Sequence, residues 1–166
     1  MPTSTEIPIA TTTTSTSTSS VTFSSLGSYT DLVLVCQVQQ VTDGEDFAMQ
    51  FNSDTGTNYS RVFLCGDGSA VTSGLDTSVS RIRLDHHATP PTATSFSANI
   101  IQIQNYSNTT TYKPALARAG SLSTYAGSAA IVGMWRSTAA ITSITVFCTN
   151  SSNMKTGSTF TLYGIN

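Results

Sequence analysis

Apolar and polar residues alternate with a period of two in the last quarter of the chain, and this pattern constrains the fold most. In the segment 144–148 the residues Ile144, Val146 and Cys148 fall on one face, and Phe160 and Leu162 repeat that spacing in the segment 158–165. The polar loop 150–157 lies between them, which predicts two antiparallel strands joined as a β-hairpin. Because two strands bury too little surface to be stable alone, earlier parts of the chain must supply further strands.

Strand patterns recur through the rest of the chain, separated by turns rich in Gly, Asn, Asp and Ser. The segment 31–42 is apolar on both faces over its first half, which indicates a central strand. The segment 95–105 changes the parity of its alternation near Ile100, which predicts a β-bulge there. The segment 70–91 has no clear pattern. The other expected strands are 21–24, 47–51, 59–65, 81–84, 112–118 and 129–136.

These patterns contain no convincing helix and predict an all-β protein, an antiparallel β-sandwich of jelly-roll type. Residues 21–166 form the sandwich domain, and residues 1–20, rich in Ser and Thr, form an extended N-terminal arm. The arm is a solvated tail, or a strand that docks on its own sheet edge or on a neighbouring subunit, and the sequence does not decide among these. The expected core side chains are Leu34, Val146, Phe160, Leu162 and Trp135.

The composition is unusually poor in charge. Only 10% of the 166 residues are charged and the net charge is −2, so no basic surface is available for nucleic acid. Roughly a third of the residues are Ser or Thr, so hydroxyl groups build much of the polar surface. We also expect no signal peptide and no membrane span, since the chain has no apolar run of about 20 residues.

The cysteines and histidines give weak indications of chemistry. Cys36, Cys65 and Cys148 lack the spacing of a zinc or redox site, and we expect them to be free, buried thiols. His86 and His87 are adjacent, so on an extended chain they point to opposite sides and cannot easily hold one metal ion. We expect an exposed loop at this position.

Carboxylates gather in the turns. Asp43, Glu45 and Asp46 lie within four positions, and Asp54 and Asp67 lie in other turns. Calcium requires about six or more oxygen ligands, and no calcium-loop motif is present, so hydrated turns are the favoured interpretation. No nucleophile and base stand in a recognisable motif either. We expect no catalytic residue, no metal site and no cofactor, and therefore no enzyme.

Six segments spread along the chain carry recognisable structural motifs. They are Ile-Ala-Thr-Thr-Thr from Ile9, Ser-Val-Thr-Phe-Ser-Ser from Ser20, Tyr-Thr-Asp-Leu-Val-Leu from Tyr29, Phe-Asn-Ser-Asp-Thr-Gly-Thr-Asn-Tyr-Ser from Phe51, Ile-Gln-Ile-Gln-Asn-Tyr from Ile101, and Phe-Thr-Leu-Tyr-Gly-Ile from Phe160. These segments resemble a family of small virion structural proteins of tailed bacteriophages, including cyanophages. The resemblance covers nearly the whole chain except about residues 70–91.

The resemblance implies a β-sandwich subunit displayed on a virion that is assembled in the bacterial cytoplasm. The favoured role is a capsid decoration, or cement, protein that bridges capsid subunits; the alternative is a receptor- or glycan-binding module of a tail fibre or spike. The implied partners are the major capsid protein and copies of the chain itself, as a homotrimer, with a host-surface glycan in the alternative. The candidate contact residues are Ile7, Ile9, Thr11, Thr13, Tyr106 and Tyr112.

Overall fold

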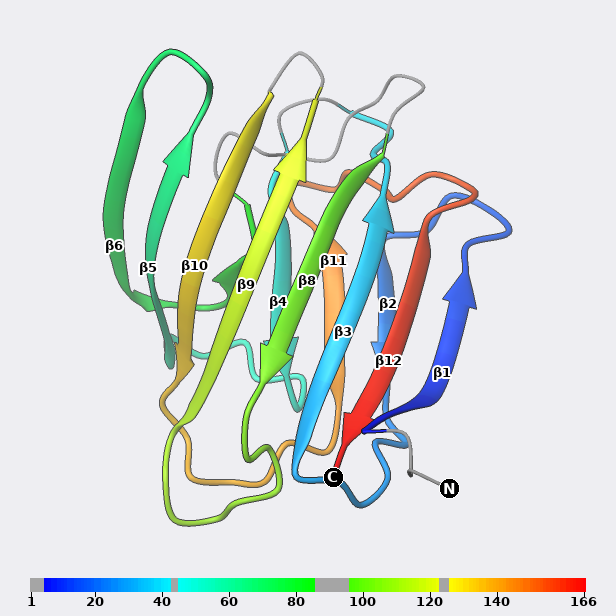
Figure 1. Cartoon of the computed structure of the whole chain (residues 1–166), viewed down its shortest axis with the longest axis vertical. Helices are drawn as coiled ribbons and strands as arrows, with labels where there is room; N and C mark the ends of the chain where they lie inside the picture. The colour runs from blue at the N-terminus through cyan, green and yellow to red at the C-terminus, as the bar shows by residue number, and fades with distance from the viewer. Residues whose placement is uncertain (1–4, 43–44, 86–95, 123–125) are drawn as a thin grey trace.

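The computed structural model describes residues 5–42, 45–85, 96–122 and 126–166 of the chain. Within these ranges the protein contains twelve β-strands and no helix, which confirms the expected all-β fold. The strands form two antiparallel sheets, and Figure 1 shows the larger sheet lying in front of the smaller one. The two layers are consistent with a β-sandwich.

The large sheet has eight strands and the small sheet has four. The order in the large sheet is β1 (Glu6–Thr13), β12 (Thr159–Ile165), β3 (Asp31–Val38), β8 (Ser97–Ile103), β9 (Lys113–Ser121), β10 (Gly127–Trp135), β5 (Tyr59–Gly66) and β6 (Val71–Val79). The order in the small sheet is β2 (Ser20–Phe23), β11 (Ile144–Cys148), β4 (Phe47–Phe51) and β7 (Ile82–Arg83).

The core lies between the sheets and is built from the alternation of each strand. Every second residue of β3, β5, β8, β9, β10 and β12 is buried, as a sheet with one covered face requires. The small sheet supplies the buried side chains of β2, β4 and β11. The expected core residues lie inside: Leu34, Val146, Phe160 and Leu162 are fully buried and Trp135 is 3% exposed.

The predicted C-terminal hairpin is wrong. The faces of β11 and β12 are as expected, but β11 pairs with β2 and β4 in the small sheet, whereas β12 pairs with β1 and β3 in the large sheet. The connection between them crosses from one sheet to the other. Alternation determines which side chains are buried, and it carries no information about which strand lies alongside.

The predicted bulge near Ile100 is also wrong. The register of β8 is unbroken against both β3 and β9, and Ile100 faces outward. The inward positions include Ser97 and Asn99, two buried polar residues that obscure the pattern. They are satisfied locally, because the Ser97 hydroxyl donates to the Val38 carbonyl (3.1 Å) and the Asn99 amide donates to the Ser97 hydroxyl (3.1 Å).

Two strands are longer than the sequence indicates. The segment 70–91, in which we expected little beyond a short strand, contains the nine-residue edge strand β6, and the weak segment 112–118 is part of the nine-residue strand β9. At the other edge, β1 runs antiparallel to β12 of the same chain. The backbone then stays close to the C-terminal region, since the Thr14 amide donates to the Ser158 carbonyl (2.9 Å).

Candidate functional site

The most distinctive surface lies on the outer face of the large sheet, on the side that the small sheet leaves uncovered. The strand register aligns outward side chains from neighbouring strands into cross-strand rows. One row contains Leu75, Val62, Val132, Leu116 and Gln102, from β6 to β8. The next row contains Ser73, Leu64, Ala130, Arg118, Ile100, Val35, Thr161 and Thr11, from β6 to β1.

We call the apolar part of these rows the aliphatic surface. It consists of Val62, Leu64, Ile100, Leu116, Ala130 and Val132, on β5, β8, β9 and β10. Its five large side chains are between 39% and 54% exposed, where an ordinary solvated sheet face would carry polar residues. Monomeric soluble proteins rarely expose such continuous apolar patches, so the surface has the character of a contact site.

A hollow of about 590 Å³ lies over the middle of the aliphatic surface. Ala130 lies between Leu64 and Arg118 in the cross-strand row, and its small side chain leaves space that the larger neighbours surround. Arg118 is the single charged side chain among the described residues that line the hollow. A partner side chain that is apolar, with an acceptor for the guanidinium, would be complementary to it.

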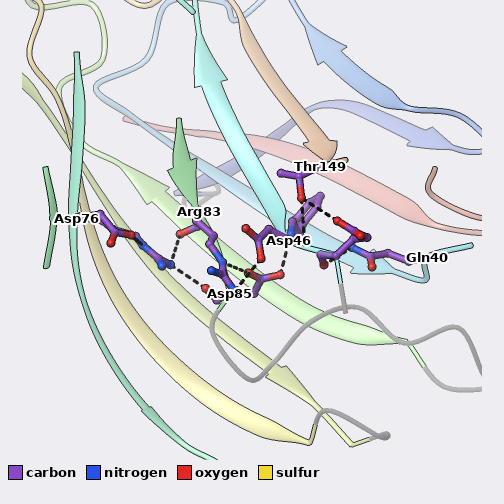
Figure 2. A network of polar contacts seen from close by, with 9 residues as sticks. Gln40, Asp46, Asp76, Arg83, Asp85 and Thr149 are labelled. Carbon is purple, nitrogen blue, oxygen red and sulfur yellow. Dashed lines mark hydrogen bonds and ion pairs between the residues drawn. The ribbon is translucent and has the colours of Figure 1, made fainter. Parts of the chain in front are cut away.

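A buried polar network lies on the inner side of β5 and β6 (Figure 2). The guanidinium of Arg61, a residue only 3% exposed, forms an ion pair with Asp76. It also donates to the backbone carbonyls of Arg83 (3.1 Å) and Asp85 (2.7 Å). The arginine therefore joins β5 and β6 of the large sheet to β7 of the small sheet and the segment after it.

Asp85 completes this network. Its carboxylate is fully buried and accepts hydrogen bonds from the Phe47 amide (2.7 Å) and from Arg83 Nε (3.0 Å), and Asp46 pairs with Arg83 Nη2 (2.7 Å). Burial raises the pKa of Asp85 to about 6, against the lowering effect of its hydrogen bond from Phe47. Burial also raises the pKa of Asp46, opposed by Arg83. Each charged group of the network has a polar partner within the protein, so the network serves to hold the two sheets together.

The described turns place the remaining carboxylates separately. Asp54 accepts hydrogen bonds from Trp135 Nε1 (2.7 Å), Asn58 Nδ2 (2.9 Å) and the Gly56 amide (2.8 Å), and the bond from Trp135 is the main cause of its lowered pKa. Asp67 bonds within its own turn. Within the described ranges no three His, Cys, Asp or Glu residues are grouped to hold a metal ion. His86, His87 and Asp43 lie outside the described residues.

The cysteines are free and buried. Desolvation raises the pKa of Cys36, and it raises the pKa of Cys148 to about 12. Both thiols therefore stay protonated at neutral pH, which makes them unreactive as nucleophiles.

The expected contact residues are distributed over two regions. Ile7, Ile9, Thr11 and Thr13 belong to β1, where the isoleucines are half-buried and the two threonines are exposed. Tyr112 is 52% exposed just before β9. Tyr106 is buried instead, because its hydroxyl donates to the Gly27 carbonyl (2.8 Å) and accepts from the Tyr29 amide (3.3 Å). Its ring therefore supports a loop and is not presented to a partner.

Sequence reasoning missed the aliphatic surface, although a signal for it exists. The segments 59–65 and 129–136 carry apolar residues at both parities, for example Val62 next to Phe63. The sequence predicts strands in both segments and does not assign their outward faces. In the structure one of the two parities faces outward.

Comparison with known proteins adds no family to this description. Neither a protein-family model, nor a curated protein, nor a solved structure matched the chain. Among the described residues no helix has the length and apolar character that a membrane span needs.

Proposed function

We propose that the chain is a structural subunit of a virion, a decoration protein of a tailed-bacteriophage head that bridges capsid subunits. It acts through contact with its neighbours and not through turnover of a substrate. The observation that carries the proposal is the aliphatic surface, because an exposed apolar sheet face of this extent is stabilised when a partner covers it. The sequence resemblance supplies the kind of particle.

A jelly-roll topology is part of the proposal, and the strand order supports it. Strand β1 pairs with β12, β2 with β11, β3 with β8 and β4 with β7, so early strands pair in order with progressively earlier late strands. This nested order is the one found in a jelly roll, in which a long hairpin is wound into two sheets. The hairpins β5–β6 and β9–β10 are then insertions that extend the large sheet beyond its four jelly-roll strands. We call these four strands the extension. The extension carries most of the aliphatic surface, so in this proposal the two inserted hairpins build the contact surface.

The contact energy available from this surface is moderate for one subunit. Complete burial of an aliphatic side chain contributes about 1.5–3 kcal/mol, so five half-exposed ones contribute roughly 5 kcal/mol before the cost of association. That suffices for a weak single contact. Repeated over a lattice, such contacts stabilise the assembled shell, because the subunit binds the assembly and not the free capsid protein.

The N-terminal arm belongs to the proposal as a second contact. Strand β1 is an edge strand whose threonines Thr11 and Thr13 are exposed, so a neighbouring subunit can pack beside it. Because β1 also belongs to the large sheet, the test keeps the strand and changes its exposed side chains: Thr11→Lys with Thr13→Lys should leave a folded sandwich with reduced occupancy on particles. Unchanged occupancy would exclude the arm from the contact.

The main test compares two matched substitutions on particles that carry the protein. Leu116→Lys places a charge in the aliphatic surface, and Thr22→Lys places the same charge on the outer face of β2 in the small sheet. We expect the first variant to fold and be lost from purified particles, and the second to be retained. Equal retention of both would refute the proposed contact. Antibody labelling of the particles adds the location: label confined to the tail would replace the decoration role by the tail-fibre role.

A further inference from the structure

Strand β6 forms a free edge of the large sheet. Within the described residues it is paired only with β5, and Figure 1 shows it as the outermost strand of the extension. Its backbone groups that point away from β5 are therefore available to another strand. An exposed edge of this kind is a template for pairing, unless the sequence protects it.

The two edges of the large sheet differ in protection. At the opposite edge, β1 carries Pro8, which has no amide hydrogen to donate, an irregularity between Pro8 and Ala10, and the charge of Glu6. The stretch 71–76 of β6 contains no proline and no lysine, and its register against β5 is unbroken. Its one charged residue, Asp76, is already paired with Arg61.

Side chains at this edge continue the aliphatic surface. Val71 and Leu75 face outward beside Gly66 and Val62 of β5, and they are 75% and 65% exposed. They are more exposed than the five large side chains of the aliphatic surface. A strand added beside β6 would cover part of both.

We propose that β6 pairs with β6 of a second copy, antiparallel, about a two-fold axis centred on Ser73. In this register Val71 of each copy lies opposite Leu75 of the other, which makes two aliphatic cross-strand pairs. Asp76 lies opposite Ala70, so no two like charges face each other. The register also avoids the irregularity at the end of β6, where Ser78 has φ of 53°.

The β6 edge is better suited than the β1 edge to pair with a second copy of the chain. Two identical strands that pair antiparallel meet the same requirements on both sides, as in any isologous contact. Pairing with β1 of another copy would bring Pro8 into the new ladder and lose a hydrogen bond there. The two-fold axis also keeps both aliphatic surfaces on one side of the joined sheet, so the pair offers a doubled surface to a larger partner.

This inference is independent of the virion proposal, since pairing is a property of the purified chain. The measurement is the molar mass by sedimentation equilibrium. We expect twice the 17.5 kDa of one chain. A monomer, or the trimer that the family resemblance implies, would overturn the proposal.

Two sets of variants test the register. Ser73→Cys places two thiols opposite each other across the axis, and mild oxidation should convert it to a covalent dimer; the three native thiols are buried and do not compete. The double variant Val71→Lys with Leu75→Lys replaces both aliphatic pairs and should weaken dimerisation about tenfold or more. The matched control, Thr11→Lys with Thr13→Lys on β1, should leave the dimer unchanged.

The contrary results are equally specific. A dimer that survives the β6 lysines and is lost with the β1 lysines would place the contact at the other edge. A dimer in which Ser73→Cys does not cross-link would exclude the proposed register. Circular dichroism of each variant separates these results from loss of the fold, since an intact β-spectrum is required in every case.

Discussion

The outer face of the large sheet changes chemistry from one end to the other. In the middle of the strands β5, β9 and β10 the outward residues are Val, Leu and Ala, with Arg118 between them. On β1 and β12 the outward residues include four threonines, Thr11, Thr13, Thr159 and Thr161. Thr11 and Thr161 even bond to each other across the strands (3.2 Å). Both ends belong to one continuous ladder, with buried residues on the inner side of each.

This difference separates what the fold requires from what contact requires. A sheet needs buried apolar residues on its inner face, and the threonine end shows that the outer face can be polar without loss of the ladder. The aliphatic end is therefore not explained by folding. Under the proposed function, a partner that covers this surface and removes it from water would account for it.

The largest predicted effect on stability tests whether buried side chains contribute equally at the threonine end and at the aliphatic end of the large sheet. Leu162→Ala on β12 and Ile131→Ala on β10 each remove a buried side chain and should lower the free energy of unfolding by about 2–5 kcal/mol. Urea denaturation measures both. A small loss for Ile131→Ala alone would mean that the extension is loosely attached, and the comparison of the two ends would fail.

The second effect concerns the buried charges beneath the extension. Burial raises the pKa of Asp85 from 3.8 to about 6. Between these two pH values the carboxyl group is protonated in the native state and ionised in the unfolded state. Stability from this group is greatest below pH 3.8 and falls as the pH rises to about 6, by roughly 2–3 kcal/mol in total. Denaturation midpoints over this pH range measure the slope, and Asp85→Asn should flatten it. An unchanged slope would assign the proton to another group.

The third effect has the opposite sign. Asp54 has a lowered pKa because Trp135 donates to it, so its contribution is present above pH 3.8 and is lost as the pH falls below that value. Asp54→Ala removes this bond at the end of β10 and should cost about 1–2 kcal/mol at neutral pH. Trp135 fluorescence during unfolding reports it. A neutral effect would show that water replaces the carboxylate.

The smallest effect on stability is the most informative about contact. Two variants exchange residue types between the two ends of the outer face: Leu64→Thr and Thr161→Leu. Each should change the free energy of unfolding of the purified protein by less than about 0.5 kcal/mol. Binding of an apolar fluorescent dye should nevertheless fall for Leu64→Thr and stay unchanged or rise for Thr161→Leu. A large loss of stability in Leu64→Thr would show that the aliphatic surface serves the fold itself.

The sequence was sufficient for the fold class and for the buried face of many strands, because the alternation in β12 or β11 needs no knowledge of distant residues. It was insufficient for pairing, as the separation of β11 and β12 into two sheets shows. It was also insufficient for β6, because none of the residues of this edge strand, Val71–Val79, is fully buried, so burial imposes no clear pattern on it. The aliphatic surface was hidden for a related reason: Val62 is as apolar as Phe63 and differs only in which way it points.

The position of β11 and β12 also has a consequence for biosynthesis. The sheet partner of β1 is β12 and that of β2 is β11, and both partners are synthesised long after β1 and β2. During translation the early strands have no pairing partner, and hydrophobic side chains such as Phe23 stay uncovered until β11 emerges from the ribosome. Such long-range pairing folds slowly and exposes the nascent chain to aggregation, so both sheets are completed only after residues 144–165 have been synthesised.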